Sequence, residues 1–391
     1  MITNYNKKND YSQYAVDGYP VRHKAKVPFN PSLKLNLEYR NAVDEIRSID
    51  NKLDDMILRS DDYLELVEDA FANNIHWSIR LEGNELSLVE VKKITTLFTN
   101  SRKKEVGVGP QQEVLNHLYS FFMKDAFNLP WNMNHIKEVH RNLMDHIEMP
   151  GIPGRIRDVD VSVYGDDGTE YFRPCPHAHI EKELTSLLEW LHSSPYDAII
   201  TSVLFFHEFE SIHPFQDGNG RVGRTLFQIL LQELGLKNSK LCKFEQEILG
   251  DSGTYYSLLA YTDRTSDYFP IVMYFTESLL QAYRTALKTF GERNVLNRLD
   301  DNSRTIIMRS KKVAAFSVSD ACGWVSAIGE QMMRIKLNEL VDMGLLIKYG
   351  KTRSMRFQFN DPFGDVKELL DILSMSEAGV EEFDGQYEKI E

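Results

Sequence analysis

The sequence has few cysteines, no long apolar run and no excess of basic residues. Its three cysteines, Cys175, Cys242 and Cys322, are odd in number and widely spaced, which argues against a disulfide framework and indicates a reducing compartment. No stretch reaches the roughly 18 apolar residues of a membrane-spanning helix, and residues 1–14 lack the apolar stretch of a secretory signal. We therefore expect a cytoplasmic protein without membrane contact.

The charge balance excludes some classes of partner. The chain of 391 residues has 58 acidic and 45 basic side chains, so as a whole it is neither a nucleic-acid coat nor a membrane-surface binder. Its composition of 42% hydrophobic and 11% aromatic residues is typical of a globular protein with two or three packed units.

Helical periodicity dominates the first 290 residues, so the predicted fold class is mainly α. Residues 1–32 are polar and contain three prolines, which predicts an irregular arm. After the arm, apolar residues recur at steps of three and four, and this spacing predicts helices over 35–57, 61–86, 112–128, 132–147, 177–193, 196–212 and 221–235.

One segment departs from the helical pattern. Val159, Val161 and Val163 alternate with polar residues, and a Gly-Asp-Asp-Gly tip separates them from Tyr171 and Phe172. Alternation around such a tip predicts a β-hairpin over 159–172. An isolated hairpin is marginally stable, so this one should pack on, or bind, another segment.

A second unit is predicted after residues 290–300, where apolar density falls. Residues 300–375 show a helix, a turn with Gly323, a helix from Ile328 to Met343 and two strand-like runs, the order of a small winged helix-turn-helix domain. Residues 376–391 are acid-rich and predict a tail without packed structure.

The winged-helix segment could contact DNA or a protein. Residues 309–356 carry more basic than acidic side chains, and Lys351 and Arg353 at the tip could meet phosphates. Against DNA binding, Glu330, Glu339 and Asp342 share the helix that would enter the groove. Both interpretations stay open, as does a homo-oligomer.

The stretch "HPFQDGNGRVGR", residues 213–224, gathers the groups of a phosphate-transfer site. Pro214 disfavours helical geometry before it, so a helix should end at His213. The next helix begins near Gly218, Asn219 and Gly220, where unpaired backbone N–H groups and the helix dipole favour an anion.

Charged side chains complete this stretch. Arg221 and Arg224 share one helix face and could reach further phosphates, and Asp217 could hold Mg²⁺ against them. A Gly/Asn/Asp loop between helices is often only a turn, and a histidine at a helix end only a cap. Their convergence here favours transfer of a phosphate-containing group to a hydroxyl that His213 deprotonates.

The stretch resembles the signature of the Fic family, His-Pro-Phe-x-Asp/Glu-Gly-Asn-Gly-Arg-x-x-Arg, at every fixed position. The resemblance extends over about residues 20–290: the hairpin resembles the family's flap, and "SGTYYSLL" resembles its downstream helix. It implies an arm and helical region over 1–100 and a Fic catalytic core over 101–290. It also implies a protein adenylyltransferase, which moves AMP from ATP to a Ser, Thr or Tyr hydroxyl of a target protein docked on the flap.

The resemblance assigns a role to each matching residue. His213 would be the general base, and Asp217 would hold Mg²⁺ between the α- and β-phosphates. The phosphates would be bound by Gly218, Asn219, Gly220, Arg221 at the β-phosphate and Arg224 at the γ-phosphate. Relatives with lysine in place of Gly220 can act as kinases. Tyr255 and Tyr256 fall where the family places aromatic rings beside adenine, although a tyrosine on such a helix is a core residue about as often.

A second motif predicts self-inhibition. Val67, Phe71, Ile75, Ser78 and Glu82 follow one helical stripe, and a carboxylate on such a stripe is costly unless a cation meets it. Gly83 is a plausible helix-ending residue. The alternative is that Glu82 lies at the helix end and simply reaches solvent.

"SIRLEGN", with Ser78, Glu82 and Gly83, resembles the inhibitory motif Ser/Thr-x-x-x-Glu-Gly/Asn of Fic proteins. By that resemblance Glu82 pairs with Arg224 and removes the partner of the γ-phosphate. In some relatives the same glutamate also aligns water to remove AMP, so a reverse activity is open. The alternative from another class is a DNA-binding transcriptional regulator whose Fic domain only senses nucleotide.

Overall fold

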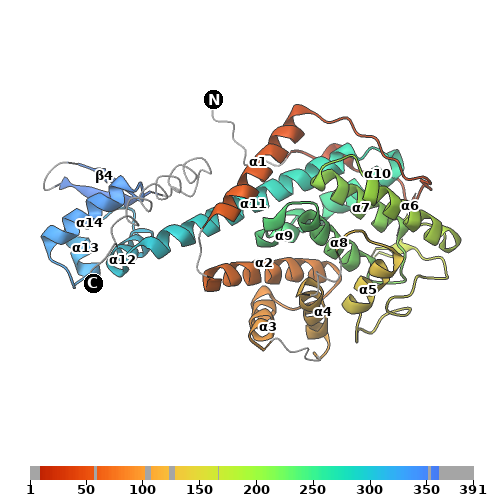
Figure 1. The fold of residues 1–391 in the computed structure, drawn as a ribbon, viewed down its shortest axis with the longest axis horizontal. Coiled ribbons are helices and arrows are strands. Elements are labelled where there is room, and N and C mark those ends of the chain that lie inside the picture. The colour runs from red at the N-terminus through yellow and green to blue at the C-terminus, as the bar shows by residue number, and fades with distance from the viewer. Residues whose placement is uncertain are drawn as a thin grey trace, which may run out of the picture. The chain divides into compact units, whose positions relative to one another are not determined.

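The computed structural model describes residues 9–56, 60–101, 107–122, 128–165, 167–350 and 354–360. The chain divides into two compact units, one made of residues 1–54 and 63–283 and the other of 55–62 and 284–391. The fold is mainly helical, as predicted (Figure 1).

The first unit contains most of the helices. They are α1 (Leu37–Asp55), α2 (Ser60–Leu81), α3 (Leu88–Ser101), α4 (Pro110–Phe122), α5 (Met133–Leu143), α6 (Ile180–Ser193), α7 (Ala198–Ile212), α8 (Asn219–Glu233), α9 (Phe244–Leu249), α10 (Ser252–Thr265) and α11 (Phe269–Arg298), with short 3-10 turns at Ser12–Tyr14, His177–His179 and Lys237–Leu241. Helix α11 continues into the second unit.

Helix α7 forms the centre of the first unit. Almost all of its residues are buried, as expected for a helix that is apolar on every side. It packs against α6 and α8 (Figure 1). The side chain of Asp197 caps its N-terminus by accepting hydrogen bonds from the N–H groups of Ile199 and Ile200.

The helix predictions differ from the structure mainly at element ends. Residues 123–127 of the predicted helix 112–128 lie outside the described residues. Helix α3 was not predicted, because apolar side chains such as Val89 and Leu97 are exposed and blur its periodicity. A signal for it was present: Ser87 and Glu90 form reciprocal hydrogen bonds typical of a capping box.

A hairpin is present, as predicted, within a three-stranded sheet in the order β1-β3-β2. It starts later than the predicted residue 159, because Val159 and Val161 lie before the first strand. Strand β2 (Val163–Tyr164) pairs antiparallel with β3 (Glu170–Arg173). Strand β1 (Val21–Arg22) comes from the N-terminal arm and pairs parallel with the other edge of β3. The arm therefore supplies the support that an isolated hairpin lacks.

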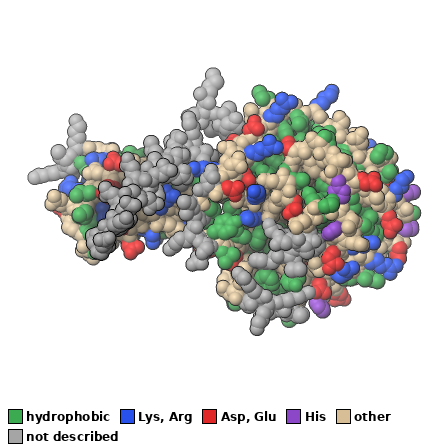
Figure 2. All heavy atoms as spheres, viewed as in Figure 1, with side chains coloured by type: hydrophobic (Ala, Val, Ile, Leu, Met, Phe, Trp, Pro, Cys, Tyr) green, Lys and Arg blue, Asp and Glu red, His purple; other side chains and the backbone are tan. Residues whose placement is uncertain are grey.

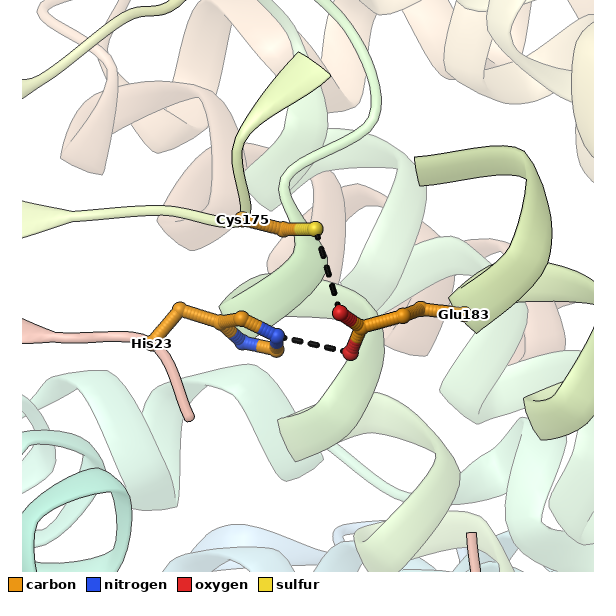
Figure 3. A group of neighbouring side chains, drawn as sticks. All are labelled: His23, Cys175 and Glu183. Atoms are coloured by element: carbon orange, nitrogen blue, oxygen red, sulfur yellow. Dashed lines mark hydrogen bonds and ion pairs between the residues drawn. The ribbon is translucent and has the colours of Figure 1, made fainter. Parts of the chain in front are cut away.

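A buried hydrogen-bonded cluster, His23–Cys175–Glu183, ties the arm to the core (Figure 3). Nε2 of His23 lies 2.7 Å from Oε2 of Glu183 on α6, and the thiol of Cys175 lies 3.5 Å from Oε1. These are residue types that bind zinc, but their ligand atoms already bond to one another. Burial raises the pKa of the Cys175 thiol to about 12, which keeps it protonated. We interpret the cluster as an anchor.

The second unit contains α12 (Asp301–Ser310), α13 (Val318–Trp324), α14 (Glu330–Asp342) and a two-stranded antiparallel sheet of β4 (Leu346–Tyr349) and β5 (Arg356–Phe359). The order of helices and strands agrees with the predicted order. The tip residues 351–353 and the predicted acidic tail lie outside the described residues.

The predicted turn at Gly323 is wrong. Gly323 lies inside α13, and the turn follows between Val325 and Gly329. A glycine costs a helix only about 1 kcal/mol. A capping box at Ser317 starts α13, and Trp324 at its end packs against Phe316 with ring centroids 4.7 Å apart.

Candidate active site

The stretch 213–224 forms the connection between α7 and α8. His213 ends α7 in the left-handed region at φ 53°, a conformation uncommon for a residue other than glycine. Asn219 holds the loop closed, because its side-chain amide accepts from the N–H of Phe215 and donates to the carbonyl of Phe215, each at 2.9 Å. The side chain of Asn219 thus holds the loop, and its backbone N–H stays available to an anion at the start of α8.

Gly218 is required by the backbone at the start of α8. Its φ is 79°, and an added Cβ would lie 2.7 Å from the sulfur of Met144. The N–H groups of the first helical turn have no intrahelical acceptors. The sequence predicts an anion site at this turn, and that role stays a prediction.

The imidazole of His213 has the protonation state of a base. Its Nδ1 lies 3.3 Å from the carbonyl oxygen of Glu210, which can only accept, so Nδ1 carries the proton and Nε2 keeps a lone pair. Burial lowers the pKa of His213 to about 4, and the positive charge of Arg157 acts in the same direction. Nε2 is therefore unprotonated near neutral pH.

Asp217 and Arg221 pair across the first turn of α8. Oδ1 of Asp217 accepts from Nη2 of Arg221 at 3.0 Å and from the N–H of Gly218 at 2.5 Å. Oδ2 accepts no hydrogen bond from the part of the chain that is described, and the Asp217 side chain is 36% exposed. Arg221 is almost fully buried, and its Nη1 also donates to Glu113 of α4.

Arg224 is bound to the end of α2. Its Nε donates to Oγ of Ser78 at 2.9 Å, and its Nη2 donates to the Ser78 carbonyl at 3.1 Å and to Oε1 of Glu82 at 2.7 Å. Burial acts to raise the pKa of Glu82, but the positive charges of Arg224 and Arg221 hold it below its usual value. The residues of the two motifs are thus brought together.

The turn that carries Glu82 is a Schellman motif. The N–H of Asn84 bonds to the carbonyl of Ile79, and the N–H of Gly83 bonds to that of Arg80. Gly83 has φ 89°, so it ends α2 as predicted. Gly220 lies against this turn: an added Cβ there would lie 2.7 Å from both Glu82 and Arg224, so a side chain at this position would disturb their pair.

Residues 130–231, which include this loop and both flanking helices, match the model of the Fic/DOC family. Over this segment the chain is similar to the Fic/DOC family. Protein adenylyltransferase fic-1 of Caenorhabditis elegans is 24% identical over 250 residues, which cover 60% of this chain and 45% of the relative. Protein adenylyltransferase Fic of Nematostella vectensis is 26% identical over 176 residues, which cover 43% and 39%.

The chain spans less than half the length of these two curated relatives. A crystal structure of a Fic family protein from Desulfovibrio desulfuricans G20 covers 85% of the chain with a TM-score of 0.58 at 22% identity, and the match includes 98% of that chain. The likeness shows that the fold is shared. Within the described residues, we found no helix with the length and hydropathy to cross a membrane.

Two buried residues outside the Fic signature hold the 213–224 loop in place, and neither was predicted from the sequence. Arg157 precedes the hairpin and donates to the carbonyl of His213 at 2.7 Å and to that of Val159 at 2.9 Å. It therefore links the backbone of His213 to the segment that leads into β2. In the sequence, Arg157 is only a basic residue beside the alternating valines. An arginine on the surface would give the same pattern.

His140 on α5 is the second such residue. The N–H of Gly154 donates to its Nδ1 at 2.7 Å, so its Nε2 carries the proton and donates to the carbonyl of Asp217 at 3.0 Å. Its ring stacks on Phe215 at 3.7 Å between centroids. Burial lowers the pKa of His140 to about 4, so the ring is neutral and serves as a support.

The two tyrosines predicted beside adenine have different surroundings. Tyr255 is buried, and its ring lies 6.4 Å from that of Phe206 in the core. Tyr256 is 52% exposed and lies edge-on to Tyr255. Of the two rings, Tyr256 is the accessible one, and the adenine role of either stays a prediction.

Two further carboxyl groups lie near Arg224. Oε2 of Glu245 on α9 lies 3.9 Å from Nε of Arg224, and Oε1 of Glu210 on α7 is buried without a hydrogen-bond partner among the described residues. Burial raises the pKa of Glu210 to about 8 and that of Glu245 to about 7. Near neutral pH, Glu82 is therefore the carboxylate that gives Arg224 a full ion pair.

Proposed function

We propose that this protein transfers AMP from ATP to a hydroxyl group of a target protein, and that Glu82 inhibits the reaction. The observation that carries the proposal is the position of an unprotonated Nε2, that of His213, at the loop that leads into the N-terminus of α8, with Arg221 and Arg224 in the first turns of that helix. The names of the adenylyltransferase relatives support the same reaction.

ATP would bind with its phosphates at the first turn of α8. The N–H groups of Asn219 and Gly220 and the helix dipole would hold the phosphates, while Arg221 and Arg224 would balance their charge. The N–H of Gly218 would join them by leaving Oδ1 of Asp217. Arg224 would have to leave Glu82 to reach the γ-phosphate. Tyr256 is the ring that would cover adenine.

The residues present fit a magnesium ion. Mg²⁺ commonly binds one or two carboxylates together with substrate phosphates, and Asp217 offers a partly exposed carboxylate beside the proposed phosphate site. A bound ion would supply charge neutralisation of the phosphates. The chain's own contribution is to hold Asp217 in place, through the bond from His140 to its carbonyl.

The reaction would follow from the base. Nε2 of His213 would take the proton of the target hydroxyl while the hydroxyl oxygen forms a bond to the α-phosphorus. The bond from this phosphorus to the bridging oxygen of the β-phosphate would break, and diphosphate would leave. Arg157 and the Glu210 carbonyl would keep the imidazole aligned.

The target would add to the sheet through β2. In the order β1-β3-β2, both β1 and β2 are edge strands within the described residues. Because β1 contacts α10, we favour the outer edge of β2 for the target. Backbone pairing at this edge presents a hydroxyl with little reading of sequence. Val163 and Tyr164 are exposed there and would contact the target side chains.

The second unit offers weaker support for DNA binding than its sequence suggested. Arg334 on α14 pairs with Glu330 at 2.6 Å, and Lys336 pairs with Asp300 at 2.7 Å. Exposed Met332 and Ile335 share this helix. Acidic and basic side chains are interspersed on the face drawn in Figure 2. We therefore favour a protein contact over the regulator alternative.

Labelled nucleotides test the proposal. We expect the purified chain with Mg²⁺ to label itself or an added cell extract from α-labelled ATP and not from γ-labelled ATP. Label from the γ position would indicate a kinase, and no label from either, even with Glu82→Gly, would favour a nucleotide sensor. Release of AMP from the labelled product by the unsubstituted chain would demonstrate the reverse activity.

A further inference from the structure

Glu113 is a partly buried acid at the site that belongs to neither motif. One of its oxygens accepts from Nη1 of Arg221, whose Nη2 donates to Asp217 at 3.0 Å. The guanidinium of Arg221 is therefore shared between two carboxylates from different elements, Glu113 on α4 and Asp217 in the loop. The side chain of Glu113 is 15% exposed.

The other oxygen of Glu113 is also engaged. Nδ2 of Asn84 donates to Oε2 of Glu113 at 2.6 Å and to the carbonyl of Pro110 at 3.0 Å, while its Oδ1 accepts from the N–H of Leu86 at 3.1 Å. Glu113 is thus held from two sides. Its carboxylate has little freedom to follow Arg221 if the arginine moves.

We propose that Glu113 is a positioning residue that keeps Asp217 available to a divalent cation by holding Arg221 from the opposite side. This inference rests on the proposed function, in which Asp217 binds that cation. An arginine with one acid partner would close on Asp217 and compete with the cation for its oxygens. A second acid draws part of the guanidinium's hydrogen bonding away from Asp217. Its negative charge also balances the positive charge of Arg221 near the cation.

The test measures nucleotide binding without turnover. The full chain with His213→Ala and Glu82→Gly is the parent, and binding of ATP is measured by calorimetry over a series of Mg²⁺ concentrations and in EDTA. In Glu113→Gln we expect the half-saturating Mg²⁺ concentration to rise about tenfold, the factor given by the loss of one nearby charge. ATP binding in EDTA should not weaken, because the site becomes more positive.

Three matched variants separate charge from structure. Glu113→Asp keeps the charge and should restore most of the Mg²⁺ response. Asn84→Ala removes a hydrogen bond to Glu113 without changing charge and should shift the response less than Glu113→Gln. Glu138→Gln removes the acid of an exposed pair with Arg141 and should shift nothing.

Two results would overturn the inference: an unchanged half-saturating Mg²⁺ concentration in Glu113→Gln, or ATP binding that weakens by the same factor with Mg²⁺ and with EDTA. The second result would indicate a merely structural role. A parent that binds no ATP at any Mg²⁺ concentration would instead contradict the proposed function.

Discussion

The two arginines of the signature each pair with a glutamate from outside it, and the two pairs are held differently. Glu82 lies one residue beyond the end of α2, on a glycine turn, and accepts one hydrogen bond among the described residues, from Arg224. Glu113 lies inside α4, and both of its oxygens are engaged. The Glu82 side chain is also the more exposed, at 25%.

This difference separates a displaceable contact from a fixed one. Moving Glu82 requires only that the last turn of α2 opens, and local opening of helix ends is among the least costly motions of a folded chain. Moving Glu113 requires a shift of α4 or the loss of its bond to Asn84. We therefore interpret Arg224–Glu82 as the switch and Arg221–Glu113 as part of the fixed site.

The largest expected effect comes from substitution of His213, the proposed general base. In a Glu82→Gly background, His213→Ala should lower self-labelling from α-labelled ATP by roughly 10²- to 10⁴-fold, because the target hydroxyl loses its proton acceptor. The exposed His179 provides the control His179→Ala, which should change nothing. Full activity of His213→Ala would contradict the mechanism. The two ion pairs could then not be compared by their effects on this reaction.

The second prediction separates the two pairs directly. Glu82→Gly should raise self-labelling roughly 5- to 150-fold, the usual range for coupling between two sites, because Arg224 becomes free for the γ-phosphate. Glu113→Gln should not raise it at any Mg²⁺ concentration. The exposed Glu85→Gly is the control for the added backbone freedom. Activation by Glu113→Gln would make Glu113 a second inhibitory residue and remove the distinction.

Much of the loop between α7 and α8 could be predicted from the sequence because its determinants are local. A proline after His213, glycines at the start of α8 and an apolar α7 each act within a few residues, and the structure agrees with them. The encounter of Glu82 with Arg224 joins residues 142 positions apart. It was predicted from the resemblance of two motifs, not from periodicity.

The supporting residues could not be predicted because their signals are not specific. Arg157, His140 and Glu113 are a basic, an imidazole and an acidic side chain on elements that also carry such groups at the surface. Only the tertiary fold shows that Arg157 and His140 are buried and that all three side chains bond to the loop or to its arginine. The same limit applies to β1, a two-residue strand that exists because the hairpin offers it an edge.

A smaller effect is expected from the glycine that carries the switch. Gly83→Ala introduces a Cβ that meets no atom within 4 Å, so its cost comes from φ 89° alone and is roughly 1–2 kcal/mol. Because this strain loosens the Schellman turn, self-labelling should rise several-fold. Gly235, at φ 111° after α8 and equally open, is the matched control: Gly235→Ala should lower the melting temperature similarly without activating the enzyme. Equal labelling by both variants would argue against a switch at this turn.

The smallest expected effect concerns the neutral carboxyls around Arg224. Burial raises the pKa of Glu210 to about 8 and that of Glu245 to about 7, whereas in the unfolded chain both titrate near the ordinary value of about 4.3. Below that value both states hold the protons and their stabilising effect is complete. Between that value and the folded pKa values of about 7 to 8, the unfolded chain has released protons that the folded chain keeps, so stability falls as the pH rises and levels off above about 8.

We therefore expect the free energy of unfolding, measured in urea, to decrease between pH 6 and pH 8 by on the order of 1 kcal/mol per pH unit. Glu210→Gln should flatten this slope, and Gln in place of the exposed Glu181 should not. A slope that Glu210→Gln leaves unchanged would mean that Glu210 is already ionised beside Arg224. Arg224 would then be shared between two acids, as Arg221 is, and Glu82 would no longer be the partner on which its charge depends.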